Sequence, residues 1–370
     1  MQVKSKKAKG KIISASLRLC GLSALLAISV TAQWVKQTVD TTASLRGLSV
    51  VNEKVVWASG TGGTVIRTTD RGKTWKVMTV PGAEKLDFRD VEAFDANTAY
   101  ILSIGNGEAS RIYKTTDGGA TWVEQFRNKN EKAFFDAIAC WDKQHCLAMS
   151  DPVDNFFLII HTDDGGKNWM IDDDSTGANT RSGEAAFAAS GTCLIITRSY
   201  PAFIVSGGQE ARVFRASPKP MHKFHWQAFD SPIVKGTAGS GIFSIAMYDG
   251  KNGVIVGGNY EKPGESKDNL AFTTDGGATW KPGIGLTGYR SGVTYIDKKT
   301  IIAVGTNGSD ISLDGGKTWK KVGLWPVSEK VTSSKIFLVG TFPVDLNSVA
   351  AKGKKAVWAV GPNGAVVKLK

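Results

Sequence analysis

An eight-residue pattern, TTDGGATW, occurs at 115–122 and again at 273–280. Close variants read TTDRGKTW at 68–75, TDDGGKNW at 162–169 and SLDGGKTW at 312–319. A pattern that returns at a regular interval is typical of a fold built from similar structural units. Successive aspartates of the pattern are 47, 47, 111 and 39 residues apart, so the long interval predicts two units. We expect the missing copy to be degenerate and to lie in RVFRASPKPMHKFHW, with Pro218 at the aspartate position.

Each copy of the octet has the composition of a tight turn between two strands. The aspartate can accept hydrogen bonds from nearby backbone amides, and the second glycine can adopt the positive φ that a tight hairpin needs. The tryptophan offers a large apolar surface to a neighbouring unit. Apolar runs on both sides predict a β-hairpin. The residues expected to have these structural roles are Asp70, Trp75, Asp117, Trp122, Asp164, Trp169, Asp275, Trp280, Asp314 and Trp319.

Each repeat also contains an earlier pair of apolar runs, as in FSIAMYDGKNGVIVGG, which gives seven four-stranded units. Radial repetition of four-stranded sheets is the architecture of a β-propeller. We therefore predict an all-β, seven-bladed β-propeller over residues 33–370. The last unit lacks an outer strand, and QWVKQTV near the start offers a spare one. We expect residues 34–39 to pair with the C-terminal blade near Val366 and close the ring. The alternative is an open array with a frayed first strand.

Residues 1–32 have the features of a secretory signal peptide. Five lysines precede the apolar stretch LCGLSALLAISV, and Val30-Thr31-Ala32 supplies small residues for cleavage near Ala32. We therefore expect an extracytoplasmic protein, periplasmic or secreted, with a retained membrane anchor as the alternative. Without the six basic residues of this leader, 40 basic and 34 acidic residues remain. This mild excess disfavours nucleic acid as a partner, but it allows peripheral attraction to acidic surfaces such as lipid headgroups.

The cysteines and histidines do not predict a metal or cofactor site. Cys140 and Cys146 flank a predicted hairpin turn, where they could form a disulfide or remain two buried thiols. Cys193 is predicted to be buried and free. His222 and His225 lie in the degenerate turn, where we expect them to be solvated rather than to bind a metal. No cofactor motif occurs along the chain.

The octet resembles the Asp-box, or BNR repeat, of sialidases and related β-propellers. The whole mature chain is similar to the seven-bladed Asp-box propellers of the photosystem II stability/assembly factor family. That resemblance implies an exported or lumenal, non-catalytic protein that holds a membrane-protein assembly intermediate. The basic patch which that family uses cannot be carried over to particular residues of this chain. We expect a monomeric binding or assembly scaffold for a protein segment or a glycan.

Binding residues are expected where the innermost strands begin, around the mouth of the central tunnel. Aligning these strands on their terminal turns and reading six residues back gives Arg46, Arg89, Asp136, Glu184, Phe243, Ser291 and Asn347. The variable loops of the same face add further candidates. The residues expected to bind a ligand are Arg46, Arg89, Glu184, Tyr289, Arg290, Asp151 and Tyr260. The alternative is that the charged members only pair with one another between blades.

A glycoside hydrolase is the alternative function. The resemblance to sialidases implies three arginines around a sugar carboxylate, for which Arg46, Arg89 and Arg290 are candidates. Tyr289 and Glu184 would form the nucleophile pair, and Asp136 would be the acid. A two-carboxylate glycosidase similar to the Asp-box xyloglucanases is a second version. The chain lacks the sialidase Arg-Ile-Pro motif and has one propeller where such glycosidases pair two, so the non-catalytic function is preferred.

Overall fold

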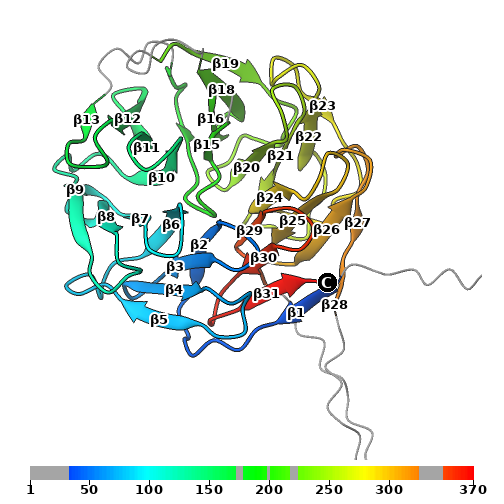
Figure 1. Ribbon diagram of the computed structural model, residues 1–370. Coiled ribbons are helices and arrows are strands. Elements are labelled where there is room, and N and C mark those ends of the chain that lie inside the picture. The colour runs from blue at the N-terminus through cyan, green and yellow to red at the C-terminus, as the bar shows by residue number, and fades with distance from the viewer. Residues whose placement is uncertain (1–32, 172–177, 198–200, 217–223, 325–344) are drawn as a thin grey trace, which may run out of the picture. The chain divides into compact units, whose positions relative to one another are not determined.

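A computed structural model describes residues 33–171, 178–197, 201–216, 224–324 and 345–370. The predicted signal peptide, Pro218 and His222 lie outside the described residues. From Ala32 to Lys370 the chain forms one compact unit. Its strands form seven sheets arranged as a ring, as predicted, and the described residues include a single short 3-10 helix, η1 (Gly107–Ala109) (Figure 1).

The blades follow one another along the chain, and in blades 1 to 6 the strands run in chain order from the innermost to the outermost. Blade 1 contains β2 (Leu45–Val50), β3 (Val56–Gly60), β4 (Thr64–Thr68) and β5 (Lys76–Thr79). Blade 2 contains β6 (Phe88–Ala93), β7 (Ala99–Ser103), β8 (Arg111–Thr115) and β9 (Val123–Arg127). Blade 3 contains β10 (Phe135–Cys140), β11 (Cys146–Val153), β12 (Phe156–Thr162) and β13 (Met170–Ile171). Blade 4 contains β15 (Leu194–Ile196), β16 (Ala202–Val205), β18 (Arg212–Ala216) and β19 (Trp226–Asp230).

Of the remaining blades, blades 5 and 7 have additional strands. Blade 5 contains β20 (Ser240–Met247), β21 (Gly253–Asn259), β22 (Leu270–Thr273) and β23 (Lys281–Pro282), and its inner edge is extended by β17 (Gly207–Gly208) and β14 (Glu184–Ala185). Blade 6 contains β24 (Gly292–Tyr295), β25 (Ile301–Gly305), β26 (Gly308–Ser312) and β27 (Lys320–Lys321). Blade 7 contains β29 (Ser348–Ala351), β30 (Val357–Val360), β31 (Val366–Leu369), β1 (Gln33–Lys36) and β28 (Gly323–Leu324).

The second strand of each blade is the most apolar part of the sequence. All residues of β3, β7, β25 and β30 are buried. Neighbouring blades cover both faces of these strands, so they read as continuous apolar runs rather than as an alternating pattern. The outermost strands are exposed, as in β13 and β27.

The Asp-box turns share one hydrogen-bond network. In the first box, the Thr68 hydroxyl and the Thr74 amide each donate to Asp70 Oδ1, over 2.8 and 3.0 Å. The Thr74 hydroxyl donates to Asp70 Oδ2 over 2.6 Å, and the Gly72 amide donates to the Thr68 hydroxyl over 3.0 Å. Gly72 has a φ of 84°, which a residue with a Cβ adopts only with strain. The corresponding atoms of the boxes at Asp117, Asp164, Asp275 and Asp314 repeat the aspartate contacts.

Box tryptophans pack against the preceding blade. Trp122 of blade 2 meets Trp57 of blade 1 edge-on, with ring centroids 6.4 Å apart. Trp75 of blade 1 makes the same contact with Trp358 of blade 7, at 5.6 Å. The octet thus both closes a hairpin and supplies the contact between neighbouring sheets.

The N-terminal strand lies in the C-terminal blade. β1 pairs antiparallel with β31, with Trp34 opposite Leu369 and Lys36 opposite Val367. On its other side, β1 pairs parallel with β28. Figure 1 shows β1 in blue beside β31 in red. The last blade therefore contains strands from both ends of the described chain.

Blade 4 differs from the sequence prediction. The sequence AFAASGTCLIIT at 186–197 has the form of a strand pair with a hairpin turn at Ser190-Gly191, and it predicts a long variable loop after it, at 198–212. Instead, the innermost strand is β15, which pairs with β16, and the predicted loop contains β16 and β17. Gly191 has a φ of 75°, and a Cβ there would lie 2.2 Å from Asp90 Oδ1. This glycine is therefore required both by its positive φ and by a close contact with blade 2.

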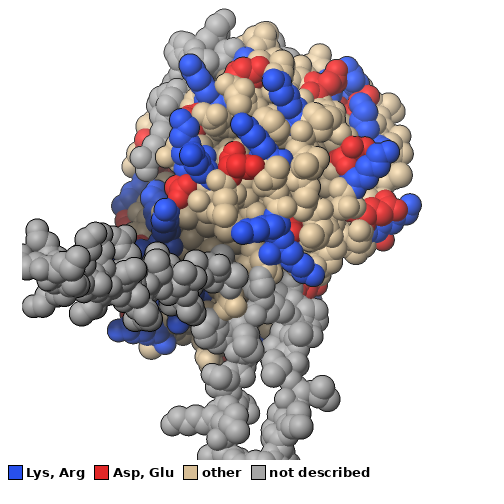
Figure 2. All heavy atoms as spheres, turned by 90° about the vertical axis from the view of Figure 1, so that its right-hand side faces the viewer, with Lys and Arg blue, Asp and Glu red and all other residues tan. Residues whose placement is uncertain are grey.

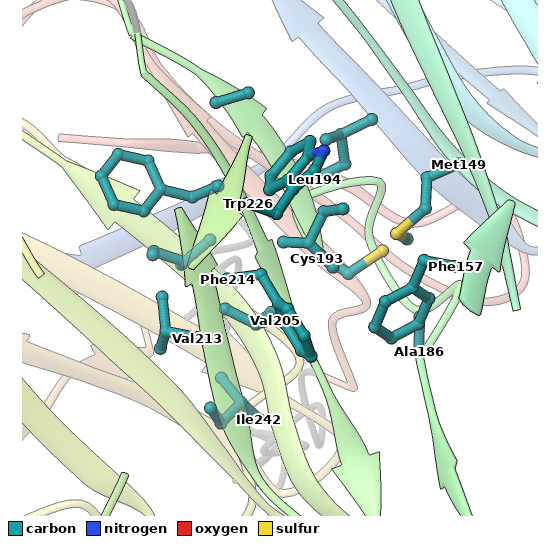
Figure 3. Packing of buried hydrophobic residues seen from close by; sticks show 14 of the residues in the cluster. Met149, Phe157, Ala186, Cys193, Leu194, Val205, Val213, Phe214, Trp226 and Ile242 are labelled. Carbon is teal, nitrogen blue, oxygen red and sulfur yellow. The ribbon is translucent and has the colours of Figure 1, made fainter. Parts of the chain in front are cut away.

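The three cysteines among the described residues have two different states. Cys140 and Cys146 form a disulfide between β10 and β11, which resolves the alternatives that the sequence left open. Cys193 is free and fully buried, as predicted. Figure 3 shows it among Leu194, Met149 and Phe157 in the core shared by blades 3 and 4.

The outer surface carries charges of both signs. On the side of the propeller shown in Figure 2, lysine and arginine side chains are interspersed with aspartate and glutamate. Within the described ranges, no helix has the length and apolar character needed to cross a bilayer.

Candidate functional site

A β-bulge near the start of the innermost strand recurs in four blades. The strand register shifts between Leu45 and Gly47, Phe88 and Asp90, Phe135 and Ala137, and Ile242 and Ser244. The extra residue at a bulge is left out of the ladder, so its side chain can be directed away from the sheet. The extra residues are Arg46, Arg89, Asp136 and Phe243.

These four residues line one cavity of about 400 Å³, which we call the axial pocket. Asp151, Tyr260 and Tyr289 line it as well. The structure therefore brings together six of the residues expected to bind or react with a ligand: Arg46, Arg89, Asp136, Asp151, Tyr260 and Tyr289. Ser291 and Asn347, from the same predicted ring, complete part of the wall.

Residues 186–192, which we call the axial segment, contribute to the lining of the pocket. Ala186, Phe187, Ala188 and Ala189 line it. The Ser190 hydroxyl donates to the Ser291 carbonyl of blade 6 over 2.8 Å, and the Ile245 amide of blade 5 donates to the Thr192 carbonyl over 3.1 Å. The segment therefore connects innermost strands of several blades, and the predicted tunnel mouth is partly filled by it.

Charged side chains of the pocket hold the backbone of the axial segment. Arg46 donates to the Ala189 carbonyl over 3.1 Å, and Arg89 donates to the Ala188 carbonyl over 3.3 Å. Asp151 Oδ1 accepts a hydrogen bond from the Ala186 amide over 2.8 Å. Blades 1, 2 and 3 thus bind one short stretch of chain through its amide and carbonyl groups.

The two arginines lie close enough to repel one another. Burial, followed by the charge of Arg89, lowers the pKa of the Arg46 guanidinium. Asp87 accepts a hydrogen bond of 2.8 Å from Arg89 Nε, and the field of Asp345 acts on Arg46 in the opposite direction to that of Arg89. Each arginine therefore has an acidic neighbour outside the cavity wall.

Two aspartates of the pocket, Asp136 and Asp151, have raised pKa values. Asp136 is 1% exposed, and burial, followed by the charge of Asp151, raises the pKa of its carboxyl well above the usual value. Burial also raises the pKa of Asp151 to about 6. Asp136 Oδ2 has no hydrogen-bond partner among the described residues. A buried polar atom without a partner is costly, so it marks a point where a ligand donor would be stabilising.

Aromatic side chains form the opposite wall. Phe187 stacks on Phe243 with ring centroids 3.8 Å apart, and Tyr289 meets Phe243 edge-on at 4.7 Å. Tyr260 stands at the rim with 48% of its surface exposed. Phe134 also lines the cavity. Phe187 and Phe134 were missed from the sequence, because Phe187 lies in the axial segment and Phe134 precedes the bulge by two residues.

Glu184 does not line the axial pocket. It forms an ion pair with Arg212, whose Nε donates to Glu184 Oε1 over 3.0 Å, and the Ser206 hydroxyl donates to the same oxygen over 2.5 Å. The side chain of Glu184 is fully buried and that of Arg212 is 8% exposed. This arrangement follows the alternative of structural pairing between blades, since β14 extends blade 5 and β18 belongs to blade 4.

Arg290 is also held away from the pocket. Its side chain and that of Asp310 are both fully buried in an ion pair within blade 6, where Arg290 Nε donates to Asp310 Oδ2 over 2.8 Å. Burial comes first among the causes that lower the pKa of Arg290. Two of the three predicted arginines therefore meet at the pocket. The structure does not place Glu184 with Tyr289 as the predicted nucleophile pair, and burial raises the pKa of that tyrosine.

Comparisons with known proteins agree with this architecture. The family model for the BNR/Asp-box repeat matches residues 310–321, the box that contains Asp314 and Trp319. No curated protein matches the chain significantly.

Solved structures with a similar fold cover nearly all of the chain. YCF48 bound to a D1 peptide is 18% identical with a TM-score of 0.62, over 91% of this chain and 96% of that one. YCF48 from Cyanidioschyzon merolae is 18% identical with a TM-score of 0.61, over 90% and 98%. The WD40 β-propeller domain of Doa1 is 10% identical with a TM-score of 0.58, over 92% and 97%. The chain is therefore a seven-bladed β-propeller that carries Asp-box repeats.

Proposed function

We propose that the protein is an exported, non-catalytic scaffold that holds an extended protein segment at the axial pocket. The observation that carries this proposal is the way in which Arg46, Arg89 and Asp151 bind the axial segment. They contact carbonyl and amide groups, which every polypeptide presents. A site already suited to backbone groups needs only unused donors and acceptors to hold a second stretch of chain.

The pocket has such unused groups. A guanidinium carries five N–H donors, and Arg46 makes one hydrogen bond within the described part of the chain. Asp136 Oδ2 is an open acceptor. The rim residue Tyr260 and the stacked Phe187 offer apolar surface to side chains of a bound segment. The similar fold of YCF48, solved with a D1 peptide, supports a protein segment as the ligand.

Several observations favour binding over glycoside hydrolysis. The sialidase-like mechanism needs Glu184 and Arg290 at the site. Both side chains instead form buried ion pairs, with Arg212 and Asp310 respectively. A retaining or inverting glycosidase needs two carboxyl groups on either side of a scissile bond. Asp136 and Asp151 come instead from adjacent strands of a single blade, and they line the same part of the wall.

Site-specific photo-crosslinking tests the proposal. We would replace Tyr260 with p-benzoylphenylalanine in the mature chain, irradiate it in the extracytoplasmic fraction and identify the linked peptides by mass spectrometry. The matched control is Tyr248, an aromatic residue of the same blade with 46% exposure, beyond the far end of β20. We expect crosslinks to a defined protein segment from position 260, absent from position 248 and reduced by Arg46→Ala.

Two outcomes would overturn the proposal. Equal crosslinking from positions 260 and 248 would show that the pocket has no part in capture. Turnover of a fluorogenic sialoside or a β-glucan by the purified protein, abolished by Asp136→Asn, would make the protein an enzyme.

A further inference from the structure

We propose that the axial pocket recognises a primary ammonium group, which hydrogen-bonds to Asp136 Oδ2 beside Asp151. This inference rests on the proposed function, because it names the group that a bound segment would insert. The ammonium can belong to a lysine side chain or to a free amino terminus. Both sources present the same three donors on one positive charge.

The first argument is the position of Asp136. The bulge in β10 takes the residue out of the strand ladder and directs it to the cavity wall. Its carboxyl is 1% exposed, and Oδ2 is without a hydrogen-bond partner in the described ranges. Proteins rarely leave a buried carboxyl oxygen unpaired, because the loss of water is then uncompensated. A ligand that brings an N–H donor to this atom removes that cost.

The second argument is the charge balance around the cavity. Arg89 is paired with Asp87, and Arg46 lies in the field of Asp345. Asp136 and Asp151 remain, and the charge of Asp151 acts on Asp136. Asp87 and Asp345 thus offset the two guanidinium groups, and the blade 3 side chains Asp136 and Asp151 have no cation of their own in the described pocket lining.

The charges of Asp151 and Arg89 act on Asp136, and hydrogen bonding from the Asp151 and Ala188 amides lowers its pKa against the larger effect of burial. The charges of Asp136, Asp90 and Asp151 act in turn on the thiol of Cys193. Arg89 is the single cation among these groups, and Asp87 already accepts a hydrogen bond from it. The described residues contain no group of three or more metal-ligating side chains. A monovalent ammonium with three donors therefore suits two carboxyl groups better than a divalent metal ion does.

The third argument is the lining of the pocket. Ala186, Phe187, Ala188 and Ala189 of the axial segment line it, so an inserted group would contact this segment. Phe187 and Phe243 offer an apolar stack, and Tyr260 stands over the rim. The methylene stem of a lysine can pack on these rings while its charged head reaches the carboxyl groups.

Calorimetric titration with three small probes tests the proposal. Nα-acetyl-lysine amide carries a side-chain ammonium, norleucine amide carries an α-ammonium, and Nα-acetyl-norleucine amide carries neither. We expect the mature protein to bind one or both amines and not the third probe. The preferred amine identifies the source of the ammonium. We also expect affinity to rise from pH 5 to pH 7, where both kinds of ammonium stay protonated, since binding requires the ionised form of a carboxyl that burial keeps protonated.

Amino-acid substitutions test whether the amine probe binds at Asp136. Asp136→Asn should reduce the affinity for the amine probe by roughly 30-fold or more, as expected when one partner of a buried charge pair is removed. Asp154→Asn is the matched control in the same blade, because Asp154 is exposed and bonds to Lys132. Tyr260→Ala should weaken amine binding while leaving both carboxyl groups in place. This variant provides the test if Asp136→Asn fails to fold.

The results separate this inference from the proposed function. Equal binding of all three probes, affinity that falls as pH rises, or full binding by a folded Asp136→Asn variant would overturn the ammonium site. Segment capture at position 260 would then still support the scaffold. Amine binding that depends on Asp136, without any captured segment, would support the ammonium site and overturn the scaffold.

Discussion

The indole nitrogen of Trp34 donates a hydrogen bond of 3.0 Å to the hydroxyl of Ser309, a residue 275 positions further along the chain. Trp34 lies in β1 of blade 7, and Ser309 lies in β26 of blade 6. The tryptophan is 3% exposed and packs in the cluster that contains Ile302, Val304 and Val349. This side chain therefore connects the first strand to residues of blades 6 and 7, which lie more than 250 positions further along the chain.

Replacement of Trp34 tests the contribution of this link. Trp34→Ala should lower the free energy of unfolding of the mature chain by about 3–5 kcal/mol, because it removes a large buried side chain. Trp34→Phe keeps most of the apolar surface and loses the hydrogen bond, so it should cost less. Urea denaturation followed by circular dichroism measures both. A Trp34→Ala variant as stable as the unmodified chain would show that β1 is not needed to hold the ring.

The Asp-boxes should make the propeller sensitive to acid. Hydrogen bonds from the Thr74 hydroxyl and amide lower the pKa of Asp70 to about 2, and those from Asn168 lower the pKa of Asp164 to about 2. An aspartate with a lowered pKa contributes stability that is present above its unfolded value of about 4 and is lost as pH falls through the folded value. We expect the melting temperature to fall between pH 4 and pH 2, and less steeply in Asp70→Asn. An unchanged slope in that variant would contradict this assignment.

The ion pair of Glu184 and Arg212 gives a test of buried charge. Arg212→Met should destabilise the protein by about 3–5 kcal/mol, because it leaves Glu184 charged and unpaired in the interior. The double variant Glu184→Leu with Arg212→Met should recover most of that loss, since no buried charge remains. Chemical denaturation of both variants measures the difference. Equal destabilisation of the single and double variants would show that packing, and not charge, determines the effect.

Asp90 should give the opposite pH dependence to the Asp-boxes. Burial raises the pKa of this carboxyl to about 7, although the amides of Ile138 and Val91 donate to it. Between pH 4 and pH 7 the folded protein keeps a proton that the unfolded chain has released, so stability should fall as pH rises through this window. Asp90→Asn should make the slope of unfolding free energy against pH less steep, while the raised pKa values of Asp136 and Asp151 keep part of it, and Asp154→Asn should leave it unchanged. A slope as steep in Asp90→Asn as in the unmodified chain would assign the effect to other groups.

Much of the fold could be predicted from the sequence because its signals are local. The octet around Asp314 fixes a turn by contacts within eight residues, and it specifies a sheet edge wherever it occurs. The bulge lies at a constant distance from the hairpin turn in several blades. Reading back from that turn therefore found Arg46, Arg89 and Asp136 at the pocket.

Blade 4 could not be predicted in this way. Ser190-Gly191 has the composition of a turn, but the glycine there serves a contact with Asp90, which is far away in the sequence. Taking Ser190-Gly191 as the hairpin turn shifted the predicted register of blade 4. Reading six residues back from that turn then placed Glu184 at the tunnel mouth. Arg290 was misplaced for a related reason. Its neighbour Tyr289 lines the pocket, and nothing local indicates that Asp310 draws the arginine into blade 6.

The pairing of β1 with β31 also determines how the molecule can assemble. These strands are the first and last described elements, so their contact has the largest loop-closure cost of any in the ring. Contacts between residues so far apart in the sequence slow folding, because the chain loses conformational entropy before the energy of the contact is gained. While the other sheets form, β31 exposes an unpaired edge that another chain could join. The seam between these two strands is therefore the step at which we expect correct closure to compete with association between molecules.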